Sequence, residues 1–188
     1  MLIFLKAAIP KKYAIRVCNE FMKLGLQGVT VVTAAGDDNV GLEYSCGGEN
    51  LNVFTPEWFA TCPWVLTVGG TQIPLETNAT TVLENSLRPV EIGWYDSVNF
   101  GGGGGFSNYF EMPDYQKKAV EHYLNTTDLG FPSYAQFANS SGFNNLGAGT
   151  DGLFNREGRA YPDVSGLAQD IAVSLPRNHR TSIDTDFT

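Results

Sequence analysis

The chain has 188 residues, of which 43% are hydrophobic and 17% are charged, and its formal net charge is −8 at pH 7. This length and apolar content suffice for one domain with a hydrophobic core, and the charged fraction is too low for a disordered polyelectrolyte. The acidic balance argues against a nucleic-acid partner, which needs a basic surface. No apolar run approaches the roughly 20 residues that cross a bilayer, so the sequence predicts a soluble protein.

The amino-terminal part contains one clear helical pattern. Residues 1–12 hold a short apolar run that Lys6 interrupts, with no basic region before it, and they do not resemble a signal peptide. In residues 13–26, apolar side chains recur at three- and four-residue spacing, and Gly28 stands just beyond the last of them. This pattern predicts an amphipathic helix that packs its apolar stripe on a sheet.

Two apolar stretches predict strands. Residues 29–34 are rich in β-branched side chains and stop abruptly at Gly36 and Asp37, and residues 64–68 repeat the pattern before Gly-Gly-Thr. A helix followed by such strands indicates the α/β class, with a doubly wound, mostly parallel sheet flanked by helices. In open sheets of this class ligands bind at the carboxyl ends of strands, where Asp37 stands.

The rest of the chain is richer in loops. Residues 41–63 and 75–91 predict loops, and the five consecutive glycines at 101–105 exclude regular structure there. This run leads directly into Phe-Ser-Asn-Tyr-Phe, so we interpret it as backbone that approaches a ligand closely, with a flexible linker as the alternative. We expect a second helix over 113–124 and a further loop over 139–158.

The carboxyl-terminal part and the histidines carry weaker signals. Residues 171–175 predict a last short strand. Asp163 follows a proline, and we interpret it as a structural acid that orients a loop. His122 and His179 have no nucleophile or carboxylate at a catalytic spacing, so both are interpreted as surface residues.

Two features bear weakly on the cellular compartment. Cys46 and Cys62 bracket a glycine-rich, aromatic loop and are the candidate disulfide, whereas Cys18 is interpreted as a small core residue. Three N-glycosylation sequons begin at Asn78, Asn125 and Asn139. Chance alone would give roughly two sequons in a chain of this composition, so they support secretion only weakly.

Five sequence blocks in order along 17–173 resemble motifs of the sedolisins, the serine-carboxyl peptidases with a subtilisin-like fold. They are V-C-N-E-F-M-K-L-G-L-Q-G at 17–28, A-A-G-D at 34–37, F-A-T-C-P-W-V followed by V-G-G-T within 59–71, G-G-G-F-S-N-Y-F followed by P-x-Y-Q within 103–116, and G-R-A-Y-P-D-V-S at 158–165. Five ordered blocks are far more specific than any single glycine motif.

The resemblance implies roles for particular residues. Subtilisin-like sequences place an asparagine after Ala-Ala-Gly to donate a hydrogen bond to the reaction's oxyanion, and here Asp37 takes that place as the oxyanion-hole acid. An ionised carboxylate only accepts hydrogen bonds, so Asp37 could donate only when protonated, which requires acidic pH or a raised pKa. The resemblance also places Gly103, Gly104 and Gly105 near the substrate cleft. The alternative for Asp37 is a turn-forming residue.

The sequence departs from the family in its catalytic residues. Sedolisins carry a Glu and an Asp on a helix as base and orienting partner, and a nucleophilic Ser in a G-T-S-A-S motif, none of which occurs here. Ser182 is not in such a motif, and the sequence after Ser174 leaves the family pattern. We expect residues 13–174 to be a central part of the peptidase domain, incomplete at both ends, with a lead at 1–12 and a divergent tail at 175–188.

The resemblance implies an acid-acting endopeptidase or tripeptidyl peptidase that hydrolyses peptide or protein substrates outside the cell or in a vacuolar or lysosomal compartment. The family's calcium site would lie beyond this sequence, so no metal or cofactor is assigned. Because the triad is missing, we expect this chain alone not to hydrolyse peptides. Two alternatives stay open: a non-catalytic peptide-binding pseudo-peptidase, and a truncated gene product with exposed sheet edges.

Overall fold

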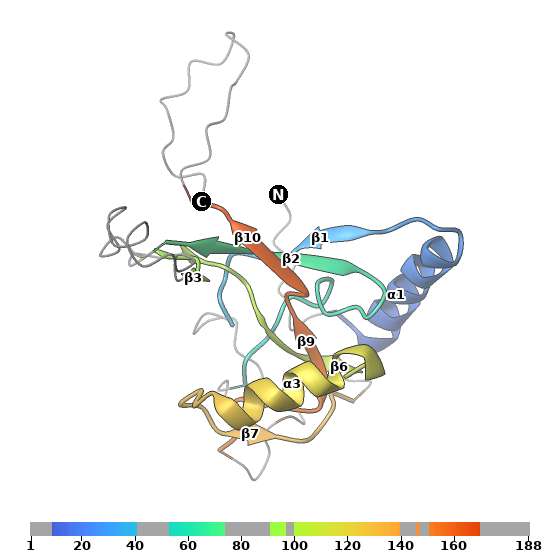
Figure 1. Ribbon diagram of the computed structural model, residues 1–188. Helices are drawn as coiled ribbons and strands as arrows, with labels where there is room; N and C mark the ends of the chain where they lie inside the picture. Colours follow the sequence, from blue (N-terminus) through green and yellow to red (C-terminus); the bar gives the residue numbers. More distant parts are fainter. Residues whose placement is uncertain are drawn as a thin grey trace, which may run out of the picture.

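A computed structural model describes residues 9–40, 53–73, 91–96, 100–139, 146 and 151–169 of the chain. The helices are α1 (Lys11–Leu26) and α3 (Asp114–Thr126). The strands are β1 (Val32–Ala34), β2 (Leu66–Gln72), β3 (Ile92–Gly93), β4 (Tyr95–Asp96), β5 (Phe100–Gly101), β6 (Gly105–Glu111), β7 (Ser133–Tyr134), β8 (Phe154–Asn155), β9 (Gly158–Tyr161) and β10 (Val164–Leu167). Figure 1 shows β1, β2 and β10 side by side, with both helices below them.

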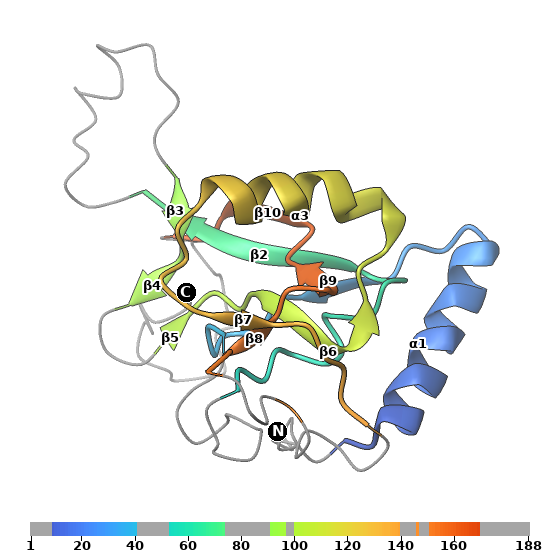
Figure 2. The same cartoon turned by 90° about the horizontal axis from the view of Figure 1, so that it is seen from below.

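Both predicted helices are confirmed, with ends that differ by up to two residues. Pro10 stands immediately before α1, and Gly28 follows the helix with a φ of +81°, a conformation that glycine adopts without strain. Pro113 stands immediately before α3, where a residue without an N–H costs no intrahelical hydrogen bond. Figure 2 shows α3 extending along β2, while α1 stands at the end of the sheet where β1 begins.

The central sheet is mostly parallel, as the sequence predicts. Its order is β1-β2-β10 with parallel pairing, and β3 pairs antiparallel with β2. The first strand is shorter than the predicted 29–34, and the second extends beyond the predicted 64–68 to Gln72. Strand β10 was not predicted, because its sequence Val-Ser-Gly-Leu has little β-branched content and its pairing with β2 decides its conformation. The predicted strand at 171–175 lies outside the described residues.

The two faces of this sheet have different environments. On one face Thr67 is fully buried, and the neighbouring Val65 packs with Cys18 of α1 and Cys62. Side chains alternate between faces, so the paired residues Val32 and Leu66, and Val68 and Val164, share the opposite face. Their exposed fractions there are 59%, 37%, 37% and 50%, in that order. Parallel sheets are normally covered on both faces, yet within the described part of the chain the helices cover one.

A second layer of short strands lies beneath the sheet. Strands β6 and β9 pair antiparallel, and β7 and β8 pair parallel. Buried side chains of these strands and of neighbouring segments pack here, including Ile9, Tyr109 of β6, Tyr134 of β7 and Leu146. The expectation that the glycine run excludes regular structure is wrong at both of its ends, because Gly101 belongs to β5 and Gly105 to β6. The predicted loop at 139–158 contains the short strand β8.

The disulfide differs from the sequence-based expectation. Cys62 bonds to Cys18, with the two Cα atoms 5.6 Å apart, so both the Cys46–Cys62 pairing and the interpretation of Cys18 as an unpaired core residue are wrong. The reason is tertiary: α1 packs on the turn before β2 and brings together two residues that are 44 positions apart in the sequence. Cys46 lies outside the described residues.

Removing this disulfide by the double substitution Cys18→Ala and Cys62→Ala should lower the free energy of unfolding by about 2–4 kcal/mol, because the bond closes a long loop in the unfolded chain. Urea unfolding under oxidising conditions measures the loss. Cys46→Ala is the control and should change the midpoint little. A Cys46–Cys62 peptide in a non-reducing peptide map would contradict this pairing.

Candidate active site

Asp37 lies just beyond the carboxyl end of β1, where the chain turns sharply. The N–H of Ala35 donates to the carbonyl of Val68 at 2.8 Å, which holds the end of β1 against β2. Gly36 then turns the chain with a φ of +97°, and the side chain of Asp37 is exposed just beyond it. Most residues other than glycine avoid a positive φ such as that of Gly36. The structure therefore places Asp37 at the carboxyl end of a parallel strand, where ligands bind in open α/β sheets.

The glycine run packs directly on the segment that carries Asp37. The N–H of Gly103 donates to the carbonyl of Gly36 at 2.6 Å, and the N–H of Gly101 donates to the carbonyl of Asp37 at 3.2 Å. A Cβ atom on Gly103 would lie 2.1 Å from the carbonyl oxygen of Ala35, which leaves room for glycine alone. The structure thus brings together two of the predicted site elements that are distant in the sequence, and these bonds argue against a linker role for the run.

A cavity of about 660 Å³ is lined in part by the glycine run. Gly103, Gly104 and Gly105 form part of its wall, and Pro56 and Tyr161 contribute apolar and aromatic surface. No charged side chain is among the described residues that line it, and Asp37 stands outside the lining. Concave, mostly apolar sites of this size are typical of ligand binding.

Buried polar contacts fix the strands behind the site. Arg159 is fully buried, and its Nη2 donates to Asp163 Oδ2 at 2.5 Å. The same carboxylate oxygen accepts the N–H of Thr67 in β2 at 2.7 Å. These are the contacts of a structural residue, as the sequence predicts for Asp163. The sequence analysis missed Arg159, whose position in the G-R-A-Y-P-D-V-S block was the available signal.

Tyr161, two residues after Arg159, bonds to the backbone of a second acid that the sequence analysis missed. Its hydroxyl oxygen accepts the N–H of Glu57 at 2.9 Å, and its ring is buried beside Ala35 and Ala60. Burial is the largest cause that raises the pKa of Tyr161 above its ordinary value, so this phenol stays protonated at acidic and neutral pH.

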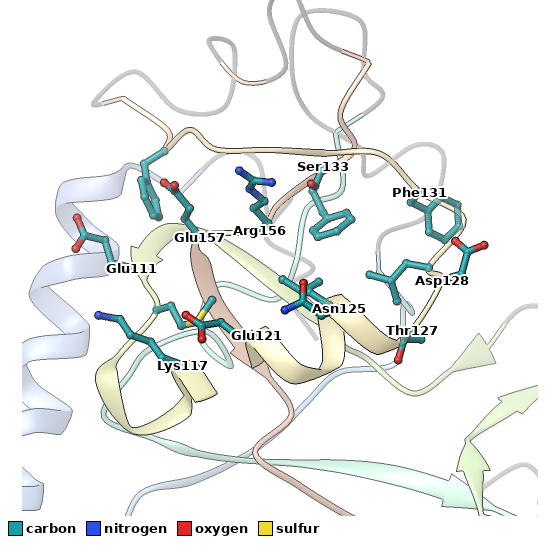
Figure 3. A pocket seen from close by; sticks show the side chains of 15 residues that line it. Glu111, Lys117, Glu121, Asn125, Thr127, Asp128, Phe131, Ser133, Arg156 and Glu157 are labelled. Atoms are coloured by element: carbon teal, nitrogen blue, oxygen red, sulfur yellow. The ribbon is translucent and has the colours of Figure 1, made fainter. Parts of the chain in front are cut away.

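A second hollow of about 800 Å³ lies beside α3. Figure 3 shows Lys117, Glu121 and Asn125 projecting from α3 toward it, with Arg156 and Glu157 across from them. Its acids and bases are mixed and open to water, so the hollow offers no buried group that would direct a reaction. Lys117 already pairs with the exposed Asp114 at 2.5 Å.

The other predicted site residues are distributed away from Asp37. Asn125, at the end of α3, and Asn139 are exposed, as glycan acceptors must be, and Asn78 lies outside the described residues. His122 is exposed on α3, and His179 lies outside the described part.

Among the residues that the structure describes, no three His, Cys, Asp or Glu side chains gather where they could hold a metal ion, so these residues do not fit a calcium site and no chemical step is assigned to a metal here. Neither described helix is long and apolar enough to cross a membrane.

Comparison with known proteins gives close sequence relatives. No protein-family model matches the chain. It is 41% identical over 174 residues to tripeptidyl-peptidase sed1 of Aspergillus fumigatus, 39% over 175 residues to aorsin of Aspergillus oryzae, and 33% over 161 residues to tripeptidyl-peptidase 1 of Bos taurus. These alignments include 89%, 88% and 86% of this chain, in that order, but only 25%, 24% and 22% of the relatives' own lengths.

A solved structure of Pseudomonas sedolisin, a serine-carboxyl proteinase, complexed with two molecules of pseudo-iodotyrostatin, aligns with a TM-score of 0.46 at 22% identity. The alignment includes 84% of this chain and 33% of the other. The likeness to known proteins depends instead on the sequence relatives, whose alignments include 86% to 89% of this chain. The chain is therefore similar in sequence to tripeptidyl-peptidases and aorsin, in line with the resemblance of its sequence blocks to the sedolisin, or serine-carboxyl peptidase, family, and it spans about a quarter of the length of these relatives.

Proposed function

We propose that this chain is the part of an acid-acting sedolisin peptidase that supplies the oxyanion-hole acid and one wall of the substrate cleft. The observation that carries the proposal is the position of Asp37 at the carboxyl end of β1, with the glycine run bonded to its backbone and the adjoining segment. The names of two of the relatives, tripeptidyl-peptidases, support peptide-bond hydrolysis as the reaction of the intact protein.

In this proposal Asp37 acts as a hydrogen-bond donor. A protonated carboxyl group donates to the carbonyl oxygen of the scissile bond, and the bond strengthens as negative charge develops on that oxygen. Acidic pH favours the protonated form, which accounts for an acid-acting enzyme. The bonds from Gly103 and Gly101 hold the backbone on either side of the donor, so that the carboxyl group need not reorganise during the reaction.

The remaining chemistry would come from groups outside this sequence. The peptide substrate would be attacked by a serine that a Glu and Asp pair activates, and we propose that this chain contains none of the three. Residues 13–174 would form the peptidase part, with 1–12 and 175–188 outside it, and any calcium site would lie elsewhere. The intact protein would act as an endopeptidase or tripeptidyl peptidase outside the cell or in a vacuolar or lysosomal compartment.

The purified chain should bind peptides without hydrolysing them, because an oxyanion donor has no intermediate to stabilise when nucleophile and base are missing. Mass spectrometry of a peptide library incubated at about pH 4 with the chain measures cleavage, because about half of an ordinary aspartate is protonated at that pH. Asp37→Asn, which keeps a neutral donor, is the matched control for Asp37→Ala. Robust turnover that Asp37→Ala abolishes and Asp37→Asn retains would contradict the proposal.

A peptide-binding pseudo-peptidase is the second candidate, and the cavity beside the glycine run favours it. Two results together would support this role. The chain would bind a labelled peptide saturably without hydrolysing it, and the full transcript would encode none of the remaining family segments. The truncated gene product is favoured by the exposed apolar face of the sheet, where Val32 is 59% exposed. Hydrogen exchange separates it from the others, because a poorly folded chain would show no protected core amides.

A further inference from the structure

The hollow beside α3 adjoins the cavity at the glycine run. Leu129, Phe131 and Phe154 line both of them. The Phe131 ring packs edge-to-face against Phe54, with the centroids 5.3 Å apart. The Phe154 ring stacks on Phe106 at a centroid distance of 4.9 Å. Phe131 is 53% exposed, so a peptide seated in the cavity can reach the hollow by passing over this aromatic junction.

The hollow carries an excess of acidic groups. Its acidic lining residues are Glu111, Glu121, Asp128 and Glu157, and its basic ones are Lys117 and Arg156. Asp114 bonds to the Lys117 ammonium, so one of the two cations is already engaged. This bond and the charge of Asp114 are the largest causes that raise the pKa of Lys117, and the charge of Glu121 adds to them. A ligand in the hollow therefore meets a negative potential.

Two of these carboxylates are available to a ligand. Glu121 projects from α3, and Glu157 lies across the hollow between β8 and β9 (Figure 3). Both residues are exposed, and within the described part of the chain neither carboxylate takes part in a hydrogen bond or an ion pair. The backbone of Glu157 is fixed, because its carbonyl accepts the N–H of Met112 at 2.9 Å and its N–H donates to Asn155 Oδ1 at 3.2 Å. A charge on a fixed backbone loses little freedom when a ligand binds.

Apolar side chains line the hollow between the charged groups. Met112, Leu124 and Leu129 are half-buried there. The long stems of lysine and arginine pack well on such a surface, while their cationic ends stay in water near the carboxylates. The exposed ring of Phe131 adds a further attraction, since a cation is drawn to the face of an aromatic ring. The hollow thus has the surface and the charge that suit a basic peptide segment.

We propose that the hollow beside α3 is a docking surface for a lysine- or arginine-bearing segment of a peptide whose other part occupies the cavity at the glycine run. The inference rests on the proposed function, which places a peptide along the glycine run. Charge complementarity selects the occupant, because cations on the peptide pair with Glu121 and Glu157, whereas an acidic segment is repelled. Since the hollow adjoins the cavity, each contact raises the effective concentration of the other.

The test measures how tightly the full chain binds two fluorescein-labelled dodecapeptides, by fluorescence anisotropy at about pH 5.5, where an ordinary glutamate is mostly ionised. The peptides share an apolar half with one phenylalanine, for the cavity, and carry lysines or N-acetyl-lysines at the same positions in the other half. Acetylation removes the charge and keeps the stem. The lysine peptide should bind about 3- to 10-fold more tightly, as expected for exposed ion pairs. Raising the salt from about 0.05 M to about 0.5 M should remove most of this difference.

Substitutions in the hollow test whether these carboxylates cause the preference. Glu121→Gln and Glu157→Gln should each reduce it, and the double variant should bind both peptides equally. Glu20→Gln, which neutralises an exposed acid on α1, is the matched control and should keep the full preference. The double variant Glu121→Lys and Glu157→Lys should instead favour a peptide with glutamates in place of the lysines. Such a reversal cannot come from a damaged fold.

The outcomes separate this inference from the proposed function. The apolar half alone, as a labelled hexapeptide, reports on the cavity and should bind the unmodified chain and the double glutamine variant alike. If it binds but the lysine and acetyl-lysine peptides do not differ, or if their difference survives in the double glutamine variant, the docking surface is overturned and the cleft remains. A lysine half that binds alone as tightly as the whole peptide overturns the connection between hollow and cavity. If no peptide binds, the proposed function fails and this inference with it.

Discussion

Gly103→Ala should destabilise the protein by about 3 kcal/mol or more, because the added methyl group has no space and its neighbours are backbone atoms that cannot rotate away. The new Cβ would lie 2.1 Å from the carbonyl oxygen of Ala35, 2.6 Å from its carbonyl carbon and 2.8 Å from the carbonyl oxygen of Gly36. Ala35 is itself bonded to Val68 of β2, so the strand end cannot retreat without losing that bond. The glycine run would instead have to leave the segment that carries Asp37.

The neighbouring residue provides a matched control. A Cβ atom on Gly104 would lie 3.4 Å from the carbonyl oxygen of Tyr161 and 3.7 Å from Pro162, which is ordinary van der Waals contact. Gly104→Ala should therefore change the free energy of unfolding by less than about 1 kcal/mol. Urea unfolding of the two variants gives both values. A Gly103→Ala variant as stable as Gly104→Ala would contradict the close packing described here and with it the geometry proposed for the cleft.

The features that the sequence predicted are those that local chemistry determines. The apolar spacing and the flanking Pro10 and Gly28 predict α1, and the β-branched run before Gly36 predicts the strand that presents Asp37. Each of these signals lies within a few residues of the element it defines. The oxyanion assignment of Asp37 came from the family resemblance, and its placement at a strand end agrees with that role without testing it.

The features that were missed are set by contacts between distant parts of the chain. The partner of Cys62 depends on how α1 packs, and β10 depends on its pairing with β2. No local pattern distinguishes Cys18 from Cys46 as that partner. Glu57 was missed for the same reason, since its proximity to Gly36 exists only once the turn before β2 packs against the end of β1.

The uneven covering of the sheet also bears on what the chain can do alone. The apolar face formed by Val32, Leu66, Val68 and Val164 spans three strands, and an exposed apolar area of this kind marks a surface for another protein segment or a risk of aggregation. Stability of the isolated chain then depends strongly on the contacts made on the other face. Among those contacts, Arg159 of β9 pairs with Asp163, which immediately precedes β10 and accepts the N–H of Thr67 in β2.

Arg159→Met should cost about 3–5 kcal/mol of unfolding free energy, because it removes the cation from a buried ion pair and leaves the carboxylate of its partner without compensation. The side chain of Arg159 is fully buried and that of Asp163 is 14% exposed. Besides the 2.5 Å bond to Asp163, the guanidinium donates to the carbonyls of Ala160 at 2.8 Å and Val65 at 3.3 Å. Lysine offers one compact ammonium in place of this planar fork, so Arg159→Lys should also destabilise.

A double-mutant cycle separates the two components of this loss. Adding Asp163→Asn to Arg159→Met removes the uncompensated charge, while the amide oxygen can still accept the N–H of Thr67, as the carboxylate does at 2.7 Å. The double variant should therefore be more stable than Arg159→Met alone, although both are less stable than the original chain. Arg156→Met, which removes an exposed guanidinium near β9, is the control and should cost less than about 0.5 kcal/mol. If the losses of unfolding free energy in Arg159→Met and Asp163→Asn simply add in the double variant, the cost of burying the Asp163 carboxylate does not depend on Arg159. The ion pair is then not what holds β10 against β2.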